Sequence, residues 1–227
     1  EIQSKVKMAA KAKLLKRNGK RLPVRKKPMI KQDQETACRV IAIGASTGGT
    51  TAIDKVLEGL PVNSPGILVT QHMPAGFTQA FANRLNSQFD FDIREAKTGD
   101  LILPGQVLIA PGDQHMEMVR SGDQRWVKCH SGPKYKGLRP SVDMLFRSVA
   151  KHEGANAIGV MLTGMGDDGA DAMLEMRMQG ARTIAQDQES SVVFGMPKQA
   201  FERGGAERLV PLDKIALKIR DLMREMI

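Results

Sequence analysis

Cysteine is scarce in this sequence, and long hydrophobic runs are missing from it. The 227 residues include two cysteines, Cys38 and Cys129, which excludes a disulfide framework of the kind that small secreted domains use. Cys38 opens an apolar run, so we expect a buried, reduced thiol there. No apolar stretch approaches the ~20 residues that span a bilayer, and no secretory signal is visible. We therefore expect a cytoplasmic domain without direct membrane insertion.

The net charge of +9 belongs to the first residues and does not describe the rest of the chain. Residues 1–31 hold twelve of the 34 Lys and Arg residues and one of the 25 acidic residues, a net charge of +11. Residues 32–227 therefore hold 22 bases and 24 acids, a net charge of −2. A nearly neutral core predicts no nucleic-acid partner. The basic run is typical of a solvated linker, with contact to an acidic partner or a membrane surface as the alternative.

Composition divides the chain into a basic linker, residues 1–36, and one domain, residues 37–227. In the linker, residues 4–17 are rich in Lys, Ala and Leu and could form a helix. Glycine, two prolines and many charges favour an irregular chain in residues 18–36. The domain is long enough to bury a sizeable core.

Short apolar runs alternate with amphipathic segments in the domain, a pattern that predicts alternating strands and helices. Right-handed crossovers then favour an α/β fold: a doubly wound, mostly parallel sheet flanked by helices, with a small antiparallel hairpin. The predicted strands are 40–45, 67–71, 93–96, 107–110, 157–163, 181–185 and 209–210. The predicted helices are 51–57, 77–85, 141–150, 170–179, 194–203 and 213–226, the last two with Pro197 in the first turn and Asp213 as the cap. The hairpin is 115–120 with 125–129, and 131–140 is a surface loop.

A glycine-rich turn with one serine, Gly44-Ala45-Ser46-Thr47-Gly48-Gly49, follows the first predicted strand. It lacks the lysine of a phosphate-binding P-loop, because Thr50 follows the glycines, and it is not the dinucleotide pattern G-x-G-x-x-G. It does match G-x-S-x-G, the turn that presents a serine nucleophile at the carboxyl edge of a sheet. The alternative is that Ser46 only caps the next helix.

Three predicted strands are followed by a residue that suits acyl transfer: Ser46, His72 and Asp168. Because the carboxyl ends of parallel strands share one edge, these side chains can meet in space. A serine nucleophile needs an adjacent base, and the base needs an orienting carboxylate. The order serine, histidine, acid differs from that of α/β-hydrolases, so the topology should differ too. The alternatives are a structural His72 and a helix capped by Asp167 and Asp168.

The other histidines, His115, His130 and His152, lie in the hairpin or at a helix end and are expected at the surface. No histidine stands at metal-ligand spacing from another or from a cysteine, so we expect no metal site. We also expect no cofactor, because hydrolysis by a serine needs none. A nucleotide-binding module is the rival hypothesis, and the missing P-loop lysine counts against it.

Five motifs, in the family's order, resemble the catalytic domain of the chemotaxis protein-glutamate methylesterases. They run from about residue 38 to the end of the chain. They are Ile41-x-x-Gly-Ala-Ser46-Thr-Gly-Gly49, Gln71-His72-Met73-Pro74-x-x-Phe77-Thr78, Arg139-Pro140-Ser141-Val142-Asp143-x-Leu145-Phe146, Leu162-Thr163-Gly164-Met165-Gly166-x-Asp168-Gly169-Ala170 and Gln186-Asp187-x-x-Ser190-Ser191-Val192-Val193-x-Gly195-Met196-Pro197.

The resemblance implies a serine hydrolase of bacterial chemotaxis adaptation. Such an enzyme cleaves glutamate γ-methyl esters on chemoreceptor signalling helices to glutamate and methanol, and also deamidates receptor glutamines. By matching position, Ser46 is the nucleophile, His72 the general base and then acid, and Asp168 the residue that orients it. Asp167 falls on a variable position of the family. Thr47 and Met165 are weaker candidates for shaping the pocket.

The partners that the resemblance implies are methylated cytoplasmic helices of chemoreceptors and a receiver domain that covers the active site. Residues 1–36 are too short for a receiver domain and resemble the linker that would follow one. We therefore expect either a catalytic fragment or a member without its own regulator. Thr50 stands where many relatives have proline, which should matter little. A catalytically silent scaffold is the remaining alternative, and the three filled triad positions count against it.

Overall fold

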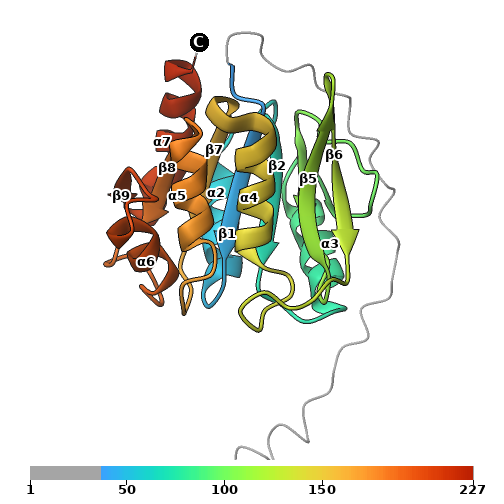
Figure 1. The fold of residues 1–227 in the computed structure, drawn as a ribbon, viewed down its shortest axis with the longest axis horizontal. Coiled ribbons are helices and arrows are strands. Elements are labelled where there is room, and N and C mark those ends of the chain that lie inside the picture. Colours follow the sequence, from blue (N-terminus) through green and yellow to red (C-terminus); the bar gives the residue numbers. More distant parts are fainter. Residues whose placement is uncertain (1–36, 227) are drawn as a thin grey trace, which may run out of the picture.

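The computed structural model describes residues 37–226, so the predicted linker lies outside the described residues. Its centre is a seven-stranded sheet in which every strand runs parallel to its neighbours (Figure 1). The spatial order is β3 (Asp92–Glu95), β4 (Gln106–Ile109), β2 (Gly66–Gln71), β1 (Val40–Ala45), β7 (Ala157–Met161), β8 (Arg182–Gln186) and β9 (Arg208–Val210). Strands β1 to β4 build one half of the sheet, with β3 at its edge, and β7 to β9 build the other half on the far side of β1, which confirms the doubly wound fold.

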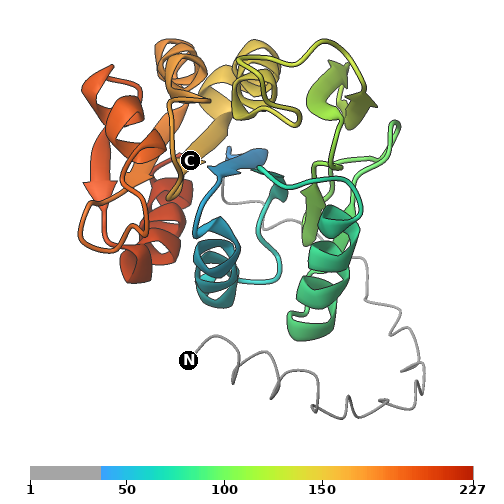
Figure 2. The same cartoon turned by 90° about the horizontal axis from the view of Figure 1, so that it is seen from below.

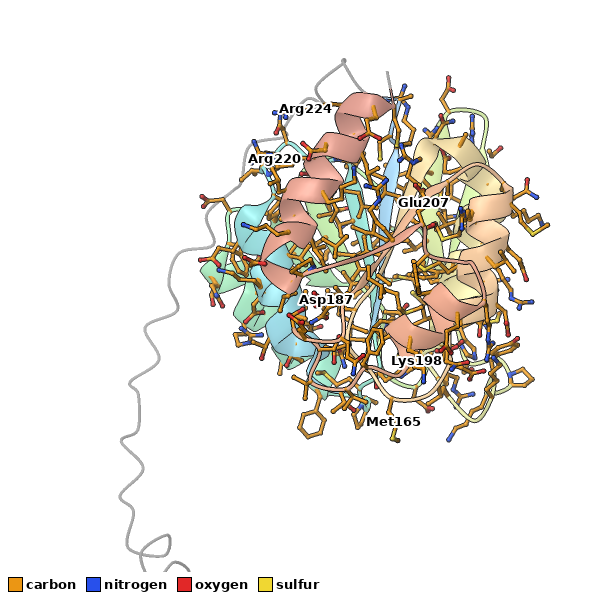
Figure 3. The ribbon with its side chains drawn as sticks, turned by 90° about the vertical axis from the view of Figure 1, so that its left-hand side faces the viewer. Met165, Asp187, Lys198, Glu207, Arg220 and Arg224 are labelled. Carbon is orange, nitrogen blue, oxygen red and sulfur yellow. The ribbon has the colours of Figure 1, made fainter. Side chains whose placement is uncertain are left out.

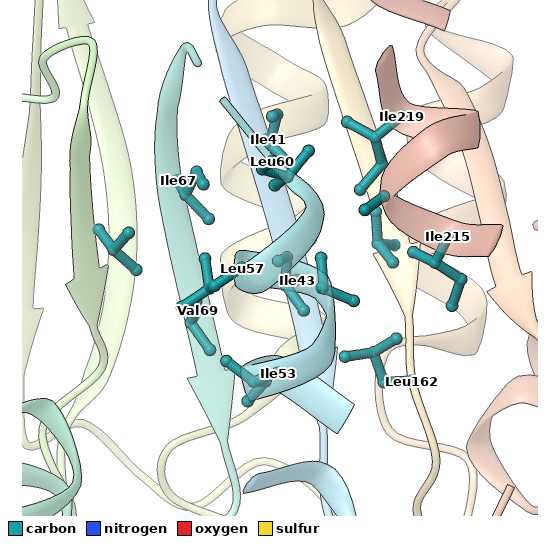
Figure 4. Close-up of a cluster of buried hydrophobic side chains, with 14 of the residues drawn as sticks. Ile41, Ile43, Ile53, Leu57, Leu60, Ile67, Val69, Leu162, Ile215 and Ile219 are labelled. Atoms are coloured by element: carbon teal, nitrogen blue, oxygen red, sulfur yellow. The ribbon is translucent and has the colours of Figure 1, made fainter. Parts of the chain in front are cut away.

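Helices cover both faces of the sheet because the central strands are apolar on both faces. The helices α2 (Gly49–Gly59), α3 (Phe77–Gln88) and α7 (Leu212–Glu225) share one core cluster with Ile41 and Ile43 of β1 (Figure 4). The helices α4 (Val142–Glu153), α5 (Ala170–Met178) and α6 (Met196–Glu202) share the other cluster with Val40 and Ala42. Successive residues of β1 thus point to opposite faces, as the two-residue period of a strand requires.

The predicted hairpin is confirmed as β5 (His115–Ser121) paired antiparallel with β6 (Gln124–His130). Its apolar side packs with the α4 cluster. The expectation that His115 lies at the surface is wrong, because its side chain is buried and its Nε2 lies 3.0 Å from the carbonyl oxygen of Pro133. The loop 131–140 therefore folds against the start of β5, whereas His130 and His152 are only partly buried.

Several predicted boundaries shift in the structure. The helix α7 takes Pro211 as its N-cap, so the prediction that Asp213 caps it is wrong, and Asp213 lies in the first turn. Pro197 lies in the first turn of α6, as predicted. Cys38 is buried as expected, and neither cysteine forms a disulfide in the described residues.

The described residues contain neither a candidate membrane span nor a cluster of metal-binding side chains. Between residues 37 and 226, no helix combines the length and the apolar character that a membrane crossing needs. In the same range, no three His, Cys, Asp or Glu side chains gather closely enough to hold a metal ion.

Candidate active site

The turn after β1 holds Ser46 by its backbone. The Ser46 N–H donates to the carbonyl of Thr163 at 3.0 Å, and the Ser46 carbonyl accepts from Gln71 Nε2 at 2.9 Å. Gly48, with a left-handed φ of 80°, is the N-cap of α2, and no side chain caps this helix. The interpretation of Ser46 as a helix cap is therefore wrong. Among the described residues, the Ser46 hydroxyl has no hydrogen-bond partner, and α2 is capped without it.

His72 follows β2 directly, next to Ser46. Ala45 and Gln71 are paired across β1 and β2, and the His72 N–H donates to the carbonyl of Ala45 at 3.1 Å. Neighbouring strands lie ~4.8 Å apart, so Ser46 and His72 leave the sheet at adjacent positions. The amide of the buried Gln71 also donates to the His72 carbonyl at 3.1 Å, and thus ties the backbones of both residues together.

Asp168 reaches His72 from the turn between β7 and α5. Its Oδ2 lies 2.7 Å from His72 Nε2, and the aspartate is only 2% exposed. Three further donors come from the start of α4: the Ser141 hydroxyl at 2.7 Å, the Val142 N–H at 2.6 Å and the Asp143 N–H at 3.2 Å. The free N–H groups and the positive end of a helix dipole favour a negative charge at this place.

The charge on Asp168 fixes the proton on His72. Burial works against ionisation of Asp168, but the hydrogen bonds from His72 and Ser141 outweigh it and hold the pKa of Asp168 below its ordinary value. An ionised carboxylate only accepts hydrogen bonds, so Nε2 of His72 must carry the hydrogen that it donates to Asp168. In the neutral ring the free lone pair is then on Nδ1, which makes no hydrogen bond to any described residue.

Asp167 is directed elsewhere, although it is the immediate neighbour of Asp168. Its carboxylate pairs with Arg203 at 2.7 Å and Lys136 at 3.2 Å, and the hydrogen bond from Arg203 is the main cause that lowers the pKa of Asp167. The N-cap of α5 is Gly169, with no side-chain cap, so the prediction that the two aspartates cap this helix is wrong. Only Asp168 takes part in the site.

The weaker pocket candidates, Thr47 and Met165, lie at the exposed rim of this edge. Met165 is 74% exposed (Figure 3), and its turn lies against the serine, because a Cβ built on Gly164 would fall 2.7 Å from the Cβ of Ser46. The hydroxyl of Thr163 donates to the Thr47 carbonyl at 2.9 Å. The N–H groups of Thr47 and Met165 donate no hydrogen bond in the described part of the chain. Thr47, directly after Ser46, and Met165, in the turn that lies against Ser46, thus keep N–H groups without a partner among the described residues.

The four segments that form the site come from distant parts of the sequence. The turns after β1, β2 and β7 and the loop before α4 meet at the lower edge of the sheet in Figure 1, which Figure 2 views from below. Sequence reasoning missed two contributors, Ser141 and Gln71. Ser141 is the N-cap of α4, but its hydroxyl binds Asp168 rather than its own helix. The signal that could have identified Gln71 was its polar side chain at the end of a largely apolar strand.

Comparison with known proteins identifies the relatives of this chain. The sequence matches the family model described as CheB methylesterase over residues 41–219. A Syntrophotalea carbinolica protein named protein-glutamate methylesterase/protein-glutamine glutaminase is 54% identical over 228 residues, which cover 99% of this chain and 65% of the relative. A Salmonella typhi protein of the same name is 50% identical over 217 residues, which cover 95% of this chain and 61% of the relative.

A solved structure supports the same relationship. The crystal structure of the Thermotoga maritima CheB methylesterase catalytic domain superposes with a TM-score of 0.79 at 38% sequence identity. The match covers 82% of this chain and 98% of that one. The match thus takes in nearly the whole of that catalytic domain, while this chain spans under two-thirds of the length of the two curated relatives.

Proposed function

The chain belongs to the CheB methylesterase family, and we propose that it hydrolyses glutamate γ-methyl esters on the cytoplasmic helices of chemoreceptors to glutamate and methanol. The name shared by its relatives extends the proposal to deamidation of receptor glutamines. The observation that carries the proposal is the 2.7 Å contact between His72 Nε2 and the buried Asp168 beside the serine turn. Ser46, His72 and Asp168 are the proposed catalytic triad.

In the first step, the Ser46 hydroxyl attacks the ester carbonyl while His72 takes its proton. We assign Nδ1 as the basic nitrogen, because Nε2 is engaged with Asp168. In the serine-protease template the two ring nitrogens have the opposite roles. Catalytic hydrogen bonds are often long without substrate and tighten in the complex, so this step does not require a preformed hydrogen bond between Ser46 and His72.

Asp168 keeps the imidazole in the productive orientation and stabilises the imidazolium that forms. Its lowered pKa keeps it ionised at neutral pH. The donors at the start of α4 satisfy its remaining lone pairs, so the carboxylate has little freedom to turn away from His72. This is the orienting role that the resemblance gives to the residue.

The oxyanion of the tetrahedral intermediate needs hydrogen-bond donors beside the serine. The N–H of Ser46 itself is already donated to Thr163, so it is not a candidate. We assign the N–H groups of Thr47 and Met165, which have no partner among the described residues. One such donor typically contributes ~3–4 kcal/mol to the lowering of the barrier.

The second half of the reaction repeats the first with water. Methanol leaves with the proton from His72, and the acyl group remains on Ser46. Water then attacks the acyl-enzyme, gives its proton to His72, and releases glutamate and the free serine. With a glutamine substrate, ammonia leaves in place of methanol. The scheme uses no cofactor.

The surroundings of the reaction are also part of the proposal. Residues 1–36 serve as a basic linker and residues 37–227 as the catalytic domain, which works in the cytoplasm on receptor helices. A receiver domain is the proposed regulatory partner, in keeping with relatives that are longer than this chain. The described domain, whose sequence carries little net charge, is not proposed to bind nucleic acid.

Replacing the nucleophile tests the proposal. Ser46→Ala should lower methanol release from a methyl-esterified receptor fragment by roughly 10⁴–10⁶-fold, the usual loss for a triad nucleophile. Ser87→Ala is a matched control, because Ser87 lies on α3 and its hydroxyl only donates to the Arg84 carbonyl at 2.7 Å. Wild-type release by the Ser46 variant would refute the scheme.

A further inference from the structure

Asp143 is a buried carboxylate that the proposed mechanism does not use. It lies in the first turn of α4 and has no exposed surface. An aspartate is almost never fully buried unless it is paired, because an unpaired carboxylate loses its hydrogen bonds to water and gains none in their place. Asp143 Oδ1 accepts the N–H of Ala172 at 3.1 Å, but its Oδ2 makes no hydrogen bond in the described structure. A fully buried carboxylate with one oxygen left without a hydrogen bond points to a role for Asp143 other than stabilising the fold.

The contacts of Asp143 are reciprocal with those of Asp168. The main-chain N–H of Asp143, in the first turn of α4, donates to Asp168 Oδ1. The side chain of Asp143 in turn accepts the N–H of Ala172, in the first turn of α5. Since α5 starts at Ala170, two residues after Asp168, the start of α4 binds Asp168 and the start of α5 binds Asp143. Figure 1 shows the two helices side by side.

The packing between these two helix starts leaves no space for adjustment. Gly169 has a φ of 90°, and a Cβ built there would fall 2.4 Å from Val142 Cγ1. A shift at the start of α5 would therefore move Asp168 with it, because the chain between them is one residue long. The Asp143 side chain bonds directly to the start of α5, at the Ala172 N–H, and so opposes such a shift.

The nearby cations do not neutralise Asp143 at hydrogen-bond distance. Lys136 Nζ lies 3.7 Å from Oδ2, and Arg147 Nη2 lies 3.7 Å from Oδ1. Burial and the charge of Asp168 raise the pKa of Asp143. A carboxylate in this setting costs stability, as buried charges commonly do. The benefit of Asp143 must then come from the positions in which it holds the residues around it.

We propose that Asp143 is a positioning residue that fixes the Asp168 carboxylate against His72 by anchoring the start of α5 to the start of α4. The inference rests on the proposed function of this site. Asp143 touches neither the serine nor the imidazole in the described contacts, so it acts through Asp168.

The first test compares Asp143→Ala with Asp143→Asn. The alanine variant loses the acceptor for Ala172, so kcat for methanol release should fall about 100-fold, the usual cost of a misplacement near 1 Å, with KM unchanged. The asparagine variant keeps an oxygen acceptor and should recover about half of that loss on a logarithmic scale, which leaves kcat about tenfold below wild type. Rates are expressed per serine labelled at the end point by a phosphonate, so that unfolded protein does not enter kcat. Asp171→Asn, a half-exposed neighbour paired with Arg203, should keep the wild-type kcat.

A double-mutant cycle separates positioning from a general structural effect. In an Asp168→Ala background, the Asp143 substitutions should cost almost nothing further, because the carboxylate they position is gone. A loss of the same size in both backgrounds would overturn the proposal, and so would a wild-type kcat in every Asp143 variant that folds. If Asp143→Ala does not fold, Asp143→Asn, expected about tenfold below wild type, decides by the same cycle.

The two proposals fail in distinguishable ways. Loss of methanol release in Ser46→Ala, together with full kcat in the folded Asp143 variants, would overturn the positioning role alone. Wild-type release by Ser46→Ala would overturn the proposed function and the positioning role with it.

Discussion

Replacing Asp168 with asparagine should disable the base without removing it. Both carboxylate oxygens accept main-chain hydrogen bonds from α4, Oδ2 from Val142 and Oδ1 from Asp143. An amide must place its NH₂ group at one of these positions, where it faces an N–H donor. If the NH₂ group faces His72, Nε2 becomes an acceptor, and the ring proton moves to Nδ1. The nitrogen that should take the serine proton is then already protonated.

The size of the loss has two contributions. The wrong tautomer lowers kcat by about 10⁴-fold in the serine-protease template, which corresponds to ~5.4 kcal/mol of lost barrier reduction. The clash of donors leaves one buried N–H unsatisfied, which costs about 1–3 kcal/mol of folding stability. The activity loss should therefore be far larger than any loss through unfolding, provided that the assay is run well below the melting temperature.

The assay is methanol release from a methyl-esterified receptor fragment, with Asp167→Asn as the matched control. Asp167 is an adjacent aspartate whose side chain is 39% exposed and pairs with Arg203 and Lys136. Exposed ion pairs contribute about 0–1 kcal/mol, so this variant should keep nearly the wild-type kcat. If the Asp167 variant were the inactive one, or if both retained full kcat, the assignment of the carboxylate would be refuted.

Three further predictions concern packing, acid stability and thiol reactivity. Gly44→Ala should lower the free energy of unfolding by about 1–3 kcal/mol in urea, because a Cβ there would fall 2.3 Å from Val142 Cγ1; an unchanged midpoint would contradict this packing. The pKa of Asp168 is lowered in the folded state, so the ionised carboxylate contributes to the free energy of unfolding. This contribution is present above the ordinary aspartate pKa and is lost as pH falls through the pKa of the folded state. The stability gap between wild type and Asp168→Asn should then narrow on acidification below about pH 4, and a constant gap would argue against it. Burial raises the pKa of Cys38 to about 12, so iodoacetamide at pH 8 should label it only after denaturation, and rapid labelling of the folded domain would be the contrary result.

The strand ends could be predicted from sequence because their signal is local. Apolar runs followed by glycine-rich or polar turns located β1, β2 and β7 within a few residues, and the residues directly after parallel strands gather at one edge of the sheet. On that basis His72 and Asp168 were expected to meet, and the structure brings them to 2.7 Å. Their catalytic roles, and that of Ser46, stay predictions.

The parts that sequence reasoning missed depend on contacts between distant segments. Ser141 and Asp143 read as the ordinary start of an amphipathic helix, and only the packing of α4 against the Asp168 turn gives them partners. Ser46 was open to a capping interpretation, because sequence does not show that Gly48 takes the left-handed cap position. His115 is buried by the loop 131–140, and the hydrophobic periodicity of a sequence does not predict the path of a loop.

Labelling by a serine-directed phosphonate reports whether His72 activates Ser46, without any assumption about the natural substrate. The phosphonate should modify Ser46 in the wild-type protein, and Ser46→Ala should abolish this modification. His72→Gln should slow the labelling by roughly 10²–10⁴-fold, the usual contribution of a general base. Equal labelling rates in the wild type and the His72 variant would contradict the activation of Ser46 by His72.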